Sequence, residues 1–274
     1  MKGVVNMPKT GVDYADYNIT VYRSCPYNCV YCWAWRVPVM ASRIRRGRYV
    51  PSVEAERVAL RCRAGERVVV SFTSDPYPFE EAWRNWTRGV ILTLRRYGEC
   101  TVMVLTKNPV LALKDRDVMV SNIAGAPRYV ECWLGTTITS ADTTDMFSAK
   151  LEPNSPKTDL RLRALKEFQR EGGYVWVSVE PIIPTRMKCF RPETIVKKVI
   201  DVLDTDKVKL VVLGRLNYVR QVRRNLPIPI LNGKEAEEWY REHVPETIDI
   251  LREHGIKYHV KKELAKTVVG VVNV

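Results

Sequence analysis

Short, strongly apolar runs alternate with longer amphipathic segments along the chain, and this alternation limits the fold more than any other feature. The runs are rich in β-branched residues and lack a polar–apolar alternation, which is typical of strands buried on both faces. We expect strands at 18–22, 67–72, 101–106, 129–137, 174–179 and 208–213, with another at 257–260. Strands separated by helices form parallel βαβ units with right-handed crossovers.

The segments between these runs carry helix signals, such as acidic first turns, an early proline or a closing glycine. We expect helices at 52–64, 79–97, 108–115, 155–170, 192–203 and 235–254. Pro245 is expected to kink or split the last of them. We therefore predict an α/β fold, a partial (β/α)6-type parallel barrel with an additional C-terminal strand. No linker divides the chain, so we expect an N-terminal arm at 1–17 and one domain at 18–274.

The length and composition agree with such a fold. The chain has 274 residues, of which 46% are hydrophobic, enough for the core of a single α/β barrel. It has no apolar stretch of about 18 residues, and its first residues contain no signal-peptide core. We predict no membrane partner and a cytoplasmic location.

Polar or metal-binding residues follow six consecutive expected strands. They occupy positions 25–32, 73–76, 106–109, 136–139, 178–181 and 214–217. In parallel barrels the active site lies at the C-terminal ends of the strands. A purely structural protein has no reason to gather such groups on one rim, so we predict a functional site there.

Three of the seven cysteines, Cys25, Cys29 and Cys32, lie within eight residues in the spacing C-x3-C-x2-C. Thiolates are the usual ligands of iron–sulfur clusters, and a [4Fe–4S] cluster normally takes four of them. Three cysteines therefore leave one iron open to another ligand. A structural zinc ion would need a fourth protein ligand, and no second paired motif follows in the sequence. We predict a [4Fe–4S] cluster, with a structural metal clip as the alternative.

This motif, directly after the first strand and with Tyr31 before the third cysteine, resembles the radical S-adenosylmethionine (SAM) superfamily. The resemblance implies that the amino and carboxylate groups of SAM chelate the open iron. It further implies that one electron cleaves SAM to methionine and a 5′-deoxyadenosyl radical, which abstracts hydrogen from a substrate. An external electron donor is implied as a partner.

Further motifs are similar to the spore photoproduct lyase-like branch of that superfamily, over roughly residues 18–186. They lie at 72–76, 105–109, 151–153, 161–165, 172 and 180–184. Phe72 stands where that lyase has a hydrogen-donating cysteine, so repair of thymine dimers itself is not expected. Cys189, after the fifth strand, is the candidate for a hydrogen donor from another direction. Its alternative role is that of a half-buried structural cysteine.

The same resemblance assigns residues to SAM. Ser74 and Lys107 would hold its methionine end, since an ammonium group is a suitable partner for a carboxylate. Thr137 or Thr139 would reach the ribose or the methionine.

Four more side chains complete these expectations. Tyr31 and Trp33 would flank the adenine. Asp75 and Glu180 would accept hydrogen bonds from the amino group or the ribose hydroxyls. Each of these carboxylates precedes a proline at a strand end, so a structural role is the alternative.

The net charge of +13 is concentrated in arginine-rich groups at 43–48, 57–67, 186–191 and 220–224. Such groups fit a polyanionic partner, nucleic acid first. The alternative is a solvated surface, as in a thermophile, with which the count of only two glutamines agrees. We expect Trp83 and Trp86 to be packing residues of their helix rather than a platform for bases.

These observations give three candidate functions. The first is a radical SAM lyase or oxidoreductase acting on nucleic acid, and the second is a radical SAM enzyme acting on a small metabolite or peptide. The third is a nucleic-acid-binding protein with a structural metal clip. Iron and sulfide content separates the third from the others, because a zinc clip contains no acid-labile sulfide.

Overall fold

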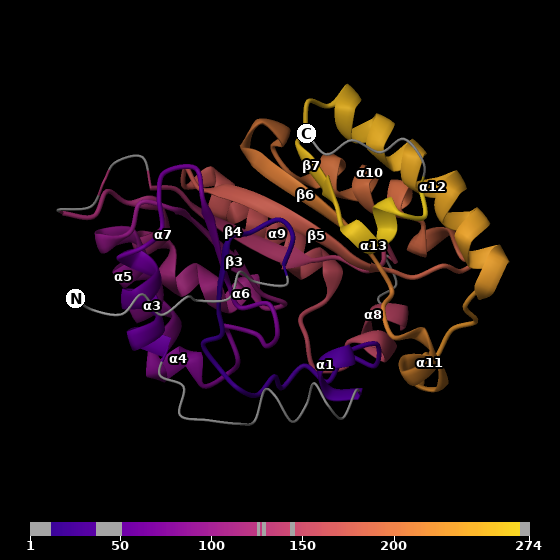
Figure 1. Cartoon of the computed structure of the whole chain (residues 1–274), viewed down its shortest axis with the longest axis horizontal. Helices are drawn as coiled ribbons and strands as arrows, with labels where there is room; N and C mark the ends of the chain where they lie inside the picture. The colour runs from indigo at the N-terminus through magenta and orange to yellow at the C-terminus, as the bar shows by residue number, and fades with distance from the viewer. Residues whose placement is uncertain (1–11, 37–50, 125–126, 128–129, 143–145, 269–274) are drawn as a thin grey trace, which may run out of the picture.

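Seven parallel strands form a single sheet in the computed structural model, which describes residues 12–36, 51–124, 127, 130–142 and 146–268 (Figure 1). The strands follow one another in the order of the sequence. They are β1 (Tyr17–Ile19), β2 (Arg67–Val70), β3 (Thr101–Leu105), β4 (Cys132–Thr137), β5 (Tyr174–Ile182), β6 (Val208–Arg215) and β7 (Tyr258–Val260). β1 and β7 are the two edges of this sheet, which curves into a partial barrel. The predicted fold class is confirmed, including the additional C-terminal strand.

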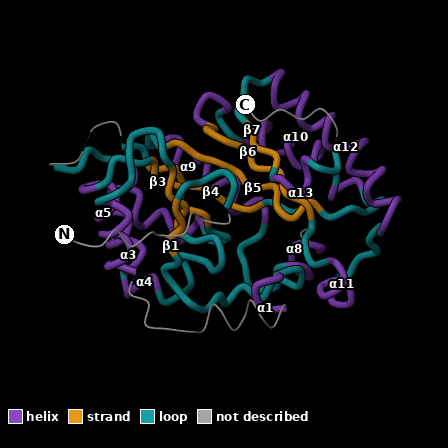
Figure 2. Tube along the Cα trace, in the orientation of Figure 1, coloured by secondary structure: helices purple, strands orange, loops and turns teal. Residues whose placement is uncertain are grey.

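The larger helices cover the outer, convex side of the sheet (Figures 1 and 2). The α-helices are α1 (Trp33–Arg36), α3 (Pro51–Ala59), α4 (Glu81–Arg84), α5 (Trp86–Tyr97), α6 (Pro109–Ala112), α7 (Arg116–Val120), α8 (Met146–Leu151), α9 (Thr158–Arg170), α10 (Pro192–Val202), α11 (Val219–Val222), α12 (Gly233–Glu253) and α13 (Lys262–Ala265). Short 3-10 turns occupy 113–115, 188–190, 205–207 and 223–225. Among the described residues, no helix is long and apolar enough to cross a membrane.

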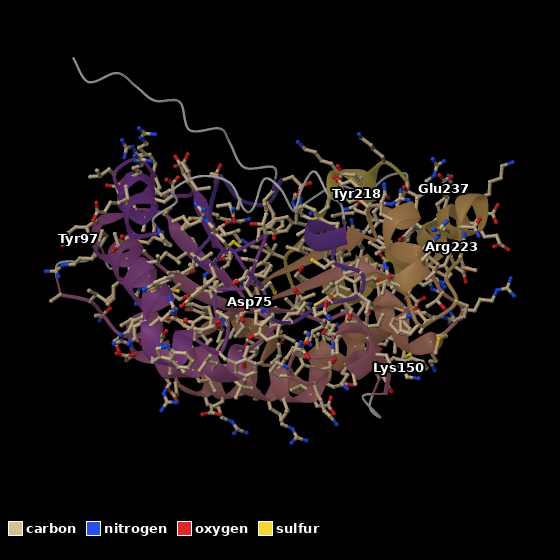
Figure 3. All side chains as sticks on the ribbon, turned by 90° about the horizontal axis from the view of Figure 1, so that it is seen from below. Asp75, Tyr97, Lys150, Tyr218, Arg223 and Glu237 are labelled. Atoms are coloured by element: carbon tan, nitrogen blue, oxygen red, sulfur yellow. The ribbon has the colours of Figure 1, made fainter. Side chains whose placement is uncertain are left out.

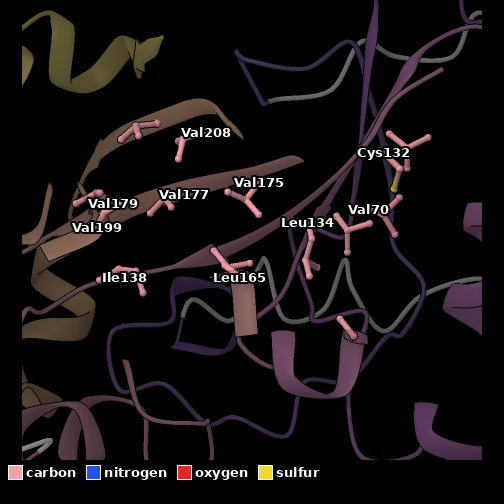
Figure 4. Packing of buried hydrophobic residues seen from close by; sticks show 14 of the residues in the cluster. Val70, Cys132, Leu134, Ile138, Leu165, Val175, Val177, Val179, Val199 and Val208 are labelled. Carbon is pink, nitrogen blue, oxygen red and sulfur yellow. The ribbon is translucent and has the colours of Figure 1, made fainter. Parts of the chain in front are cut away.

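The main core lies between the sheet and these helices. Every second strand residue points outward into it, as Val175, Val177 and Val179 of β5 do (Figure 4). Leu165 of α9 and Val199 of α10 meet them from the helix side. Each fully buried side chain of this kind contributes roughly 1.5–3 kcal/mol through its removal from water.

The alternate strand residues form a second core on the inner side of the barrel. Its centre is Trp176 of β5, whose indole N–H donates to the carbonyl of Val104 at 3.0 Å. A Cβ atom at Gly135 would lie 2.3 Å from that indole nitrogen, so only glycine fits there. The ring of Tyr14 packs against Trp176 at 5.7 Å, and Val12 is also buried. Residues 12–16 of the predicted arm thus contact the inner core, and the boundary at 17/18 remains a prediction.

Two predicted helices differ from the observed ones. The helix predicted at 79–97 is divided at Asn85, which has a left-handed backbone (φ 55°), into α4 and α5. The carboxylate of Glu81 accepts from the N–H groups of Trp86 and Thr87 at 3.1 and 3.0 Å, which caps the start of α5. α12 continues through Pro245 without the predicted split. Buried residues on both sides of the proline, such as Tyr240 and Leu251, anchor the helix to the core.

Candidate active site at the strand ends

A pocket lies where the first four strands end. Its lining comes from Cys25, Cys29, 31–34, 71–75 and 105–107 together with Thr137. The empty space is about 590 Å³, part of it open to solvent. Four of the six strand ends singled out in the sequence therefore meet in one place.

The cysteine loop after β1 is held from two sides. The hydroxyl of Tyr27, which is fully buried, donates to the carbonyl of Tyr77. The N–H of Val30 donates to the carbonyl of Leu151 at 2.9 Å, and Asn154 donates its side-chain amide to the carbonyl of Pro26 at 2.8 Å. The loop is thereby anchored to segments that follow β2 and β4.

The three thiols of this loop suit a metal. Cys29 is buried, whereas Cys25 and Cys32 are half-buried, and all three line the pocket. Burial raises the pKa of Cys29 to about 12 and that of Cys25 further. Without a cation the thiols of Cys25 and Cys29 stay neutral, and a bound metal ion compensates the charge of thiolates. The donor set therefore fits an iron–sulfur cluster, although the ligand roles remain predictions.

A buried charge network adjoins the cysteines. Nζ of Lys107 donates to Oε1 of Glu152 at 2.9 Å and to the hydroxyl of Tyr31 at 2.8 Å. Arg161 and the Tyr31 hydroxyl also donate to the Glu152 carboxylate. Burial alone would raise the pKa of Glu152, but the charges of Arg161 and Lys107 outweigh it and lower this pKa to about 2. The network is anchored to β4, because Arg161 donates to the carbonyl of Thr137 at 2.9 Å.

Asp75 and Ser74, neighbours in the loop after β2, are used differently. The buried Asp75 carboxylate accepts from the N–H groups of Tyr77 and Lys107 at 2.8 and 2.7 Å and from the hydroxyl of Thr106 at 2.7 Å. These bonds join the ends of β2 and β3. The Ser74 hydroxyl is buried, lines the pocket and has no hydrogen-bond partner within the described part of the chain. It is therefore free to bind a ligand.

Tyr31 and Trp33, the aromatic residues predicted to flank the adenine, both line the pocket. Trp33 packs beside Phe72 and Tyr218, with ring centroids 6.5 and 6.0 Å away. Phe72, which stands where the resemblance would place a hydrogen-donating cysteine, also lines the pocket.

Three predicted residues are not among the lining residues of this pocket. The Thr139 hydroxyl donates to Glu152 at 3.3 Å, so it supports the charge network. Glu180 forms an ion pair with Lys261 at 2.8 Å, next to the inner core. Cys189 is half-buried beside Ser140, and burial raises its pKa. Its side chain packs in the same apolar cluster as Cys29.

Two residues of the site, Glu152 and Arg161, have no predicted role. In the sequence they stand only inside the motifs at 151–153 and 161–165. Their side chains are 1% and 0% exposed. The available signal was one glutamate in the first motif and two arginines in the second, and the distance of nine residues between Glu152 and Arg161 concealed the pairing.

Exposed aromatic residues lie in the segment that follows β2. The packing role predicted for Trp83 is wrong, because the break at Asn85 leaves this side chain 67% exposed. Trp86, 46% exposed, stacks on Tyr22 at 5.3 Å, and the guanidinium of Arg84 lies 4.7 Å from its ring centre. Phe79 is 61% exposed in the same segment.

The arginine-rich groups are distributed over several surfaces. The group at 43–48 lies outside the described residues. The group at 220–224 is on and after α11, and Tyr218 beside it contacts Trp33 of the pocket. Seen from below in Figure 3, Asp75 lies near the middle of the molecule, with Tyr218 and Arg223 on one side and Tyr97 at the opposite end. Arg186 is exposed and lies 3.8 Å from Glu235.

Together the sheet and the helices have the fold of the radical SAM partial barrels. The individual structures most informative for comparison are those of spore photoproduct lyase. One of them, a C140S mutant, superposes with a TM-score of 0.68 at 15% identity over 94% of this chain and 80% of the lyase. Another contains bound AdoMet and dinucleoside spore photoproduct, with a TM-score of 0.67 at 15% identity over 94% and 79% of the chains. The predicted resemblance is thus confirmed in the fold.

Two further matches are a structure that superposes less well and a protein that is similar over part of its sequence. The structure of SuiB from Streptococcus suis bound to S-adenosylmethionine has a TM-score of 0.53 at 10% identity, over 94% of this chain and 50% of SuiB. An uncharacterized protein of Methanocaldococcus jannaschii is 26% identical over 177 residues. This match spans 64% of the present chain but only 63% of that relative. No protein-family model matches the sequence.

Proposed function

We propose that this chain is a radical SAM enzyme in which Cys25, Cys29 and Cys32 hold a [4Fe–4S] cluster. The observation that carries the proposal is one pocket, at the ends of four parallel strands, that combines these cysteines with Ser74 and Lys107. When bound, the reduced cluster and SAM supply a 5′-deoxyadenosyl radical that abstracts hydrogen from the substrate.

Lys107 and Ser74 are the residues that orient SAM. An ammonium group has three N–H donors, and Lys107 uses two of them on Glu152 and Tyr31. The third is left for the carboxylate of the ligand. Glu152 keeps Arg161 as a second cationic partner, so Lys107 can move toward a ligand without leaving a buried carboxylate uncompensated. The Ser74 hydroxyl supplies another polar contact.

Trp33 and Tyr31 would enclose the adenine, and Thr137 would contact the ribose or the methionine. The phenol of Tyr31 is held by Glu152, so its ring is fixed before the ligand arrives. A fixed aromatic wall excludes water from the reacting centre. Asp75, by joining β2 to β3, positions Ser74 and Lys107 rather than binding SAM itself, and Glu180 has its own partner in Lys261.

For the substrate we propose nucleic acid. The exposed Trp83, Trp86 and Phe79 follow the strand end that carries Ser74 and Asp75, and aromatic rings stack on bases whatever their sequence. The net charge of +13 favours a polyanion. Phe72 cannot donate hydrogen to a product radical, so the reaction would differ from lyase repair. Cys189, which lies outside the pocket lining, is the alternative hydrogen donor.

The test is anaerobic reconstitution followed by iron and sulfide analysis. We expect about four irons and four sulfides per chain, lost in Cys29→Ala and retained in Cys62→Ala, whose thiol is buried in the main core. With dithionite and SAM the wild type should release 5′-deoxyadenosine, and Cys29→Ala should not. A protein that retains zinc and no acid-labile sulfide would instead be the metal-clip protein.

A further inference from the structure

Two outer helices bury a histidine and a glutamate against each other, at a place that the proposed reaction does not use. His243 of α12 and Glu193 of α10 are each 4% exposed. Nδ1 of His243 lies 3.2 Å from Oε1 of Glu193, but the contact lacks hydrogen-bond geometry, so Nδ1 has no hydrogen-bond partner among the described residues. Oε2 of Glu193 is likewise buried and unpartnered there. A buried polar atom without a partner is unfavourable, so binding of a ligand to it stabilises the protein.

A third donor stands next to this pair. Glu246 follows His243 by three residues on α12, so both side chains project to the same side of the helix. One ligand atom from each of Glu193, His243 and Glu246 can be chosen so that all three lie within 4.8 Å of one another. In tetrahedral geometry, ligand atoms about 2.0–2.2 Å from one zinc ion are about 3.3–3.6 Å apart, so a side-chain adjustment of roughly 1 Å closes the site.

The surroundings allow that adjustment. Glu246 is half-exposed, and its carboxylate pairs with Nζ of Lys197 at 3.5 Å, where both side chains are more than 50% exposed. An ion pair so exposed contributes little and is readily exchanged. The ring of Trp239 packs on His243 with the centroids 4.6 Å apart, which holds the imidazole in place. Two ligands are therefore fixed in the helix interface, and the third closes the site from solvent.

We propose that Glu193, His243 and Glu246 bind a zinc ion that joins α10 to α12. One imidazole nitrogen and two carboxylates match the ligands that zinc takes in proteins, and the set contains no thiolate that would favour copper(I). Three protein ligands leave a position for water, as in zinc sites that are not fully enclosed. Because the ligands come from two helices, the ion stabilises their contact in the folded state and not in the unfolded chain.

The experiment compares zinc content and thermal unfolding of the full chain with its cluster in place. After dialysis against ZnCl2 and gel filtration, the wild type should retain one more zinc per chain than His243→Asn or Glu193→Gln. Zinc should raise the melting temperature of the wild type and not that of these variants. Glu242→Gln is the matched control, since Glu242 is exposed on the same helix. Zinc at the cysteine loop would be the same in all four proteins and cancels in the comparison.

Since the buried variants could fail to fold, Glu246→Gln provides the second test. Its side chain is 51% exposed, so we expect a normally folded protein whose zinc affinity falls by at least about tenfold. Equal zinc content and equal melting response in the wild type, His243→Asn and Glu246→Gln would overturn the proposal. The His243–Glu193 contact would then be an ordinary buried ion pair.

Discussion

Nζ of Lys107 lies 2.9 Å from the carboxylate of Glu152, so the lysine predicted to hold SAM already has a buried anionic partner within the protein. Glu152 is shared with Arg161, whose side chain is fully buried. The ligand site and the stability of the fold therefore depend on the same carboxylate. This coupling gives two predictions about stability and one about binding.

Replacement of Glu152 by Gln should be strongly destabilising. The substitution leaves Lys107 and the fully buried Arg161 without their anionic partner. Breaking a buried ion pair costs about 3–5 kcal/mol of folding free energy. Urea unfolding of the full chain measures the loss. Glu167→Gln is the control, since Glu167 is 53% exposed on α9 and lies 3.8 Å from Arg116. Its effect should stay below about 1 kcal/mol, and equal effects of the two substitutions would contradict the assigned network.

The stabilisation by Glu152 should depend on pH in a defined window. Its pKa is lowered from 4.5 to about 2 in the folded protein, so folding favours the ionised form. The contribution is then fully present above pH 4.5 and is lost as the pH falls toward about 2. The difference in unfolding free energy between the wild type and Glu152→Gln should thus be constant from pH 7 to 5 and shrink in more acidic buffer. A difference that grows below pH 4.5 would show the opposite sign of the pKa shift.

Lys107→Ala should weaken SAM binding while the protein stays folded. The variant removes one charge-assisted contact, which is worth about 1.5–3 kcal/mol, and Glu152 retains Arg161. Calorimetric titration of the reconstituted protein with SAM measures the effect, roughly ten- to a hundredfold in Kd. Lys150→Ala is the control, because Lys150 is exposed on α8. An unchanged Kd in Lys107→Ala would remove this residue from the ligand site.

The strands and the rim of polar residues at their ends could be predicted from the sequence, because both follow from local patterns. Runs such as 101–106 are strands wherever they are buried on two faces, and the polar residues after them must meet at one edge of a parallel sheet. Contacts between segments distant in the sequence could not be predicted in this way. That Glu152 joins Lys107 to Arg161 depends on how the segments after β3 and β4 approach each other. That Glu180 pairs with Lys261 depends on the position of β7, since Lys261 directly follows this strand and lies 81 residues after Glu180.

The exposure of Trp83 could not be predicted from the sequence either, although it depends on residues close to it in the chain. The period of residues 79–97 is that of one amphipathic helix, in which this tryptophan would face the core. The carboxylate of Glu81 instead caps a new helix at Trp86, and the left-handed residue Asn85 separates the two. A side chain assigned to packing is thereby turned to solvent.

The exposed tryptophan leads to a prediction about the partner. Trp83→Ala should reduce affinity for single-stranded nucleic acid by about 1–3 kcal/mol, the value of one base stacked on an aromatic ring. Since stacking releases no counterions, the dependence of affinity on salt should stay the same. Tyr97→Ala is the control, because Tyr97 is similarly exposed (61%, against 67% for Trp83) but ends α5 and lies far from Asp75 (Figure 3).

Charge reversal should have the complementary effect. Arg223 is exposed beyond α11, and a phosphate contact there would release about one counterion. Arg223→Glu should therefore weaken binding of every sequence alike and make log affinity fall less steeply with log salt, since phosphate contacts carry no base information. Fluorescence anisotropy with labelled DNA and RNA across a salt series measures both variants. If the wild type binds neither polymer at about 50 mM salt, nucleic acid is not the substrate, and a small metabolite or peptide becomes the better candidate for the same pocket.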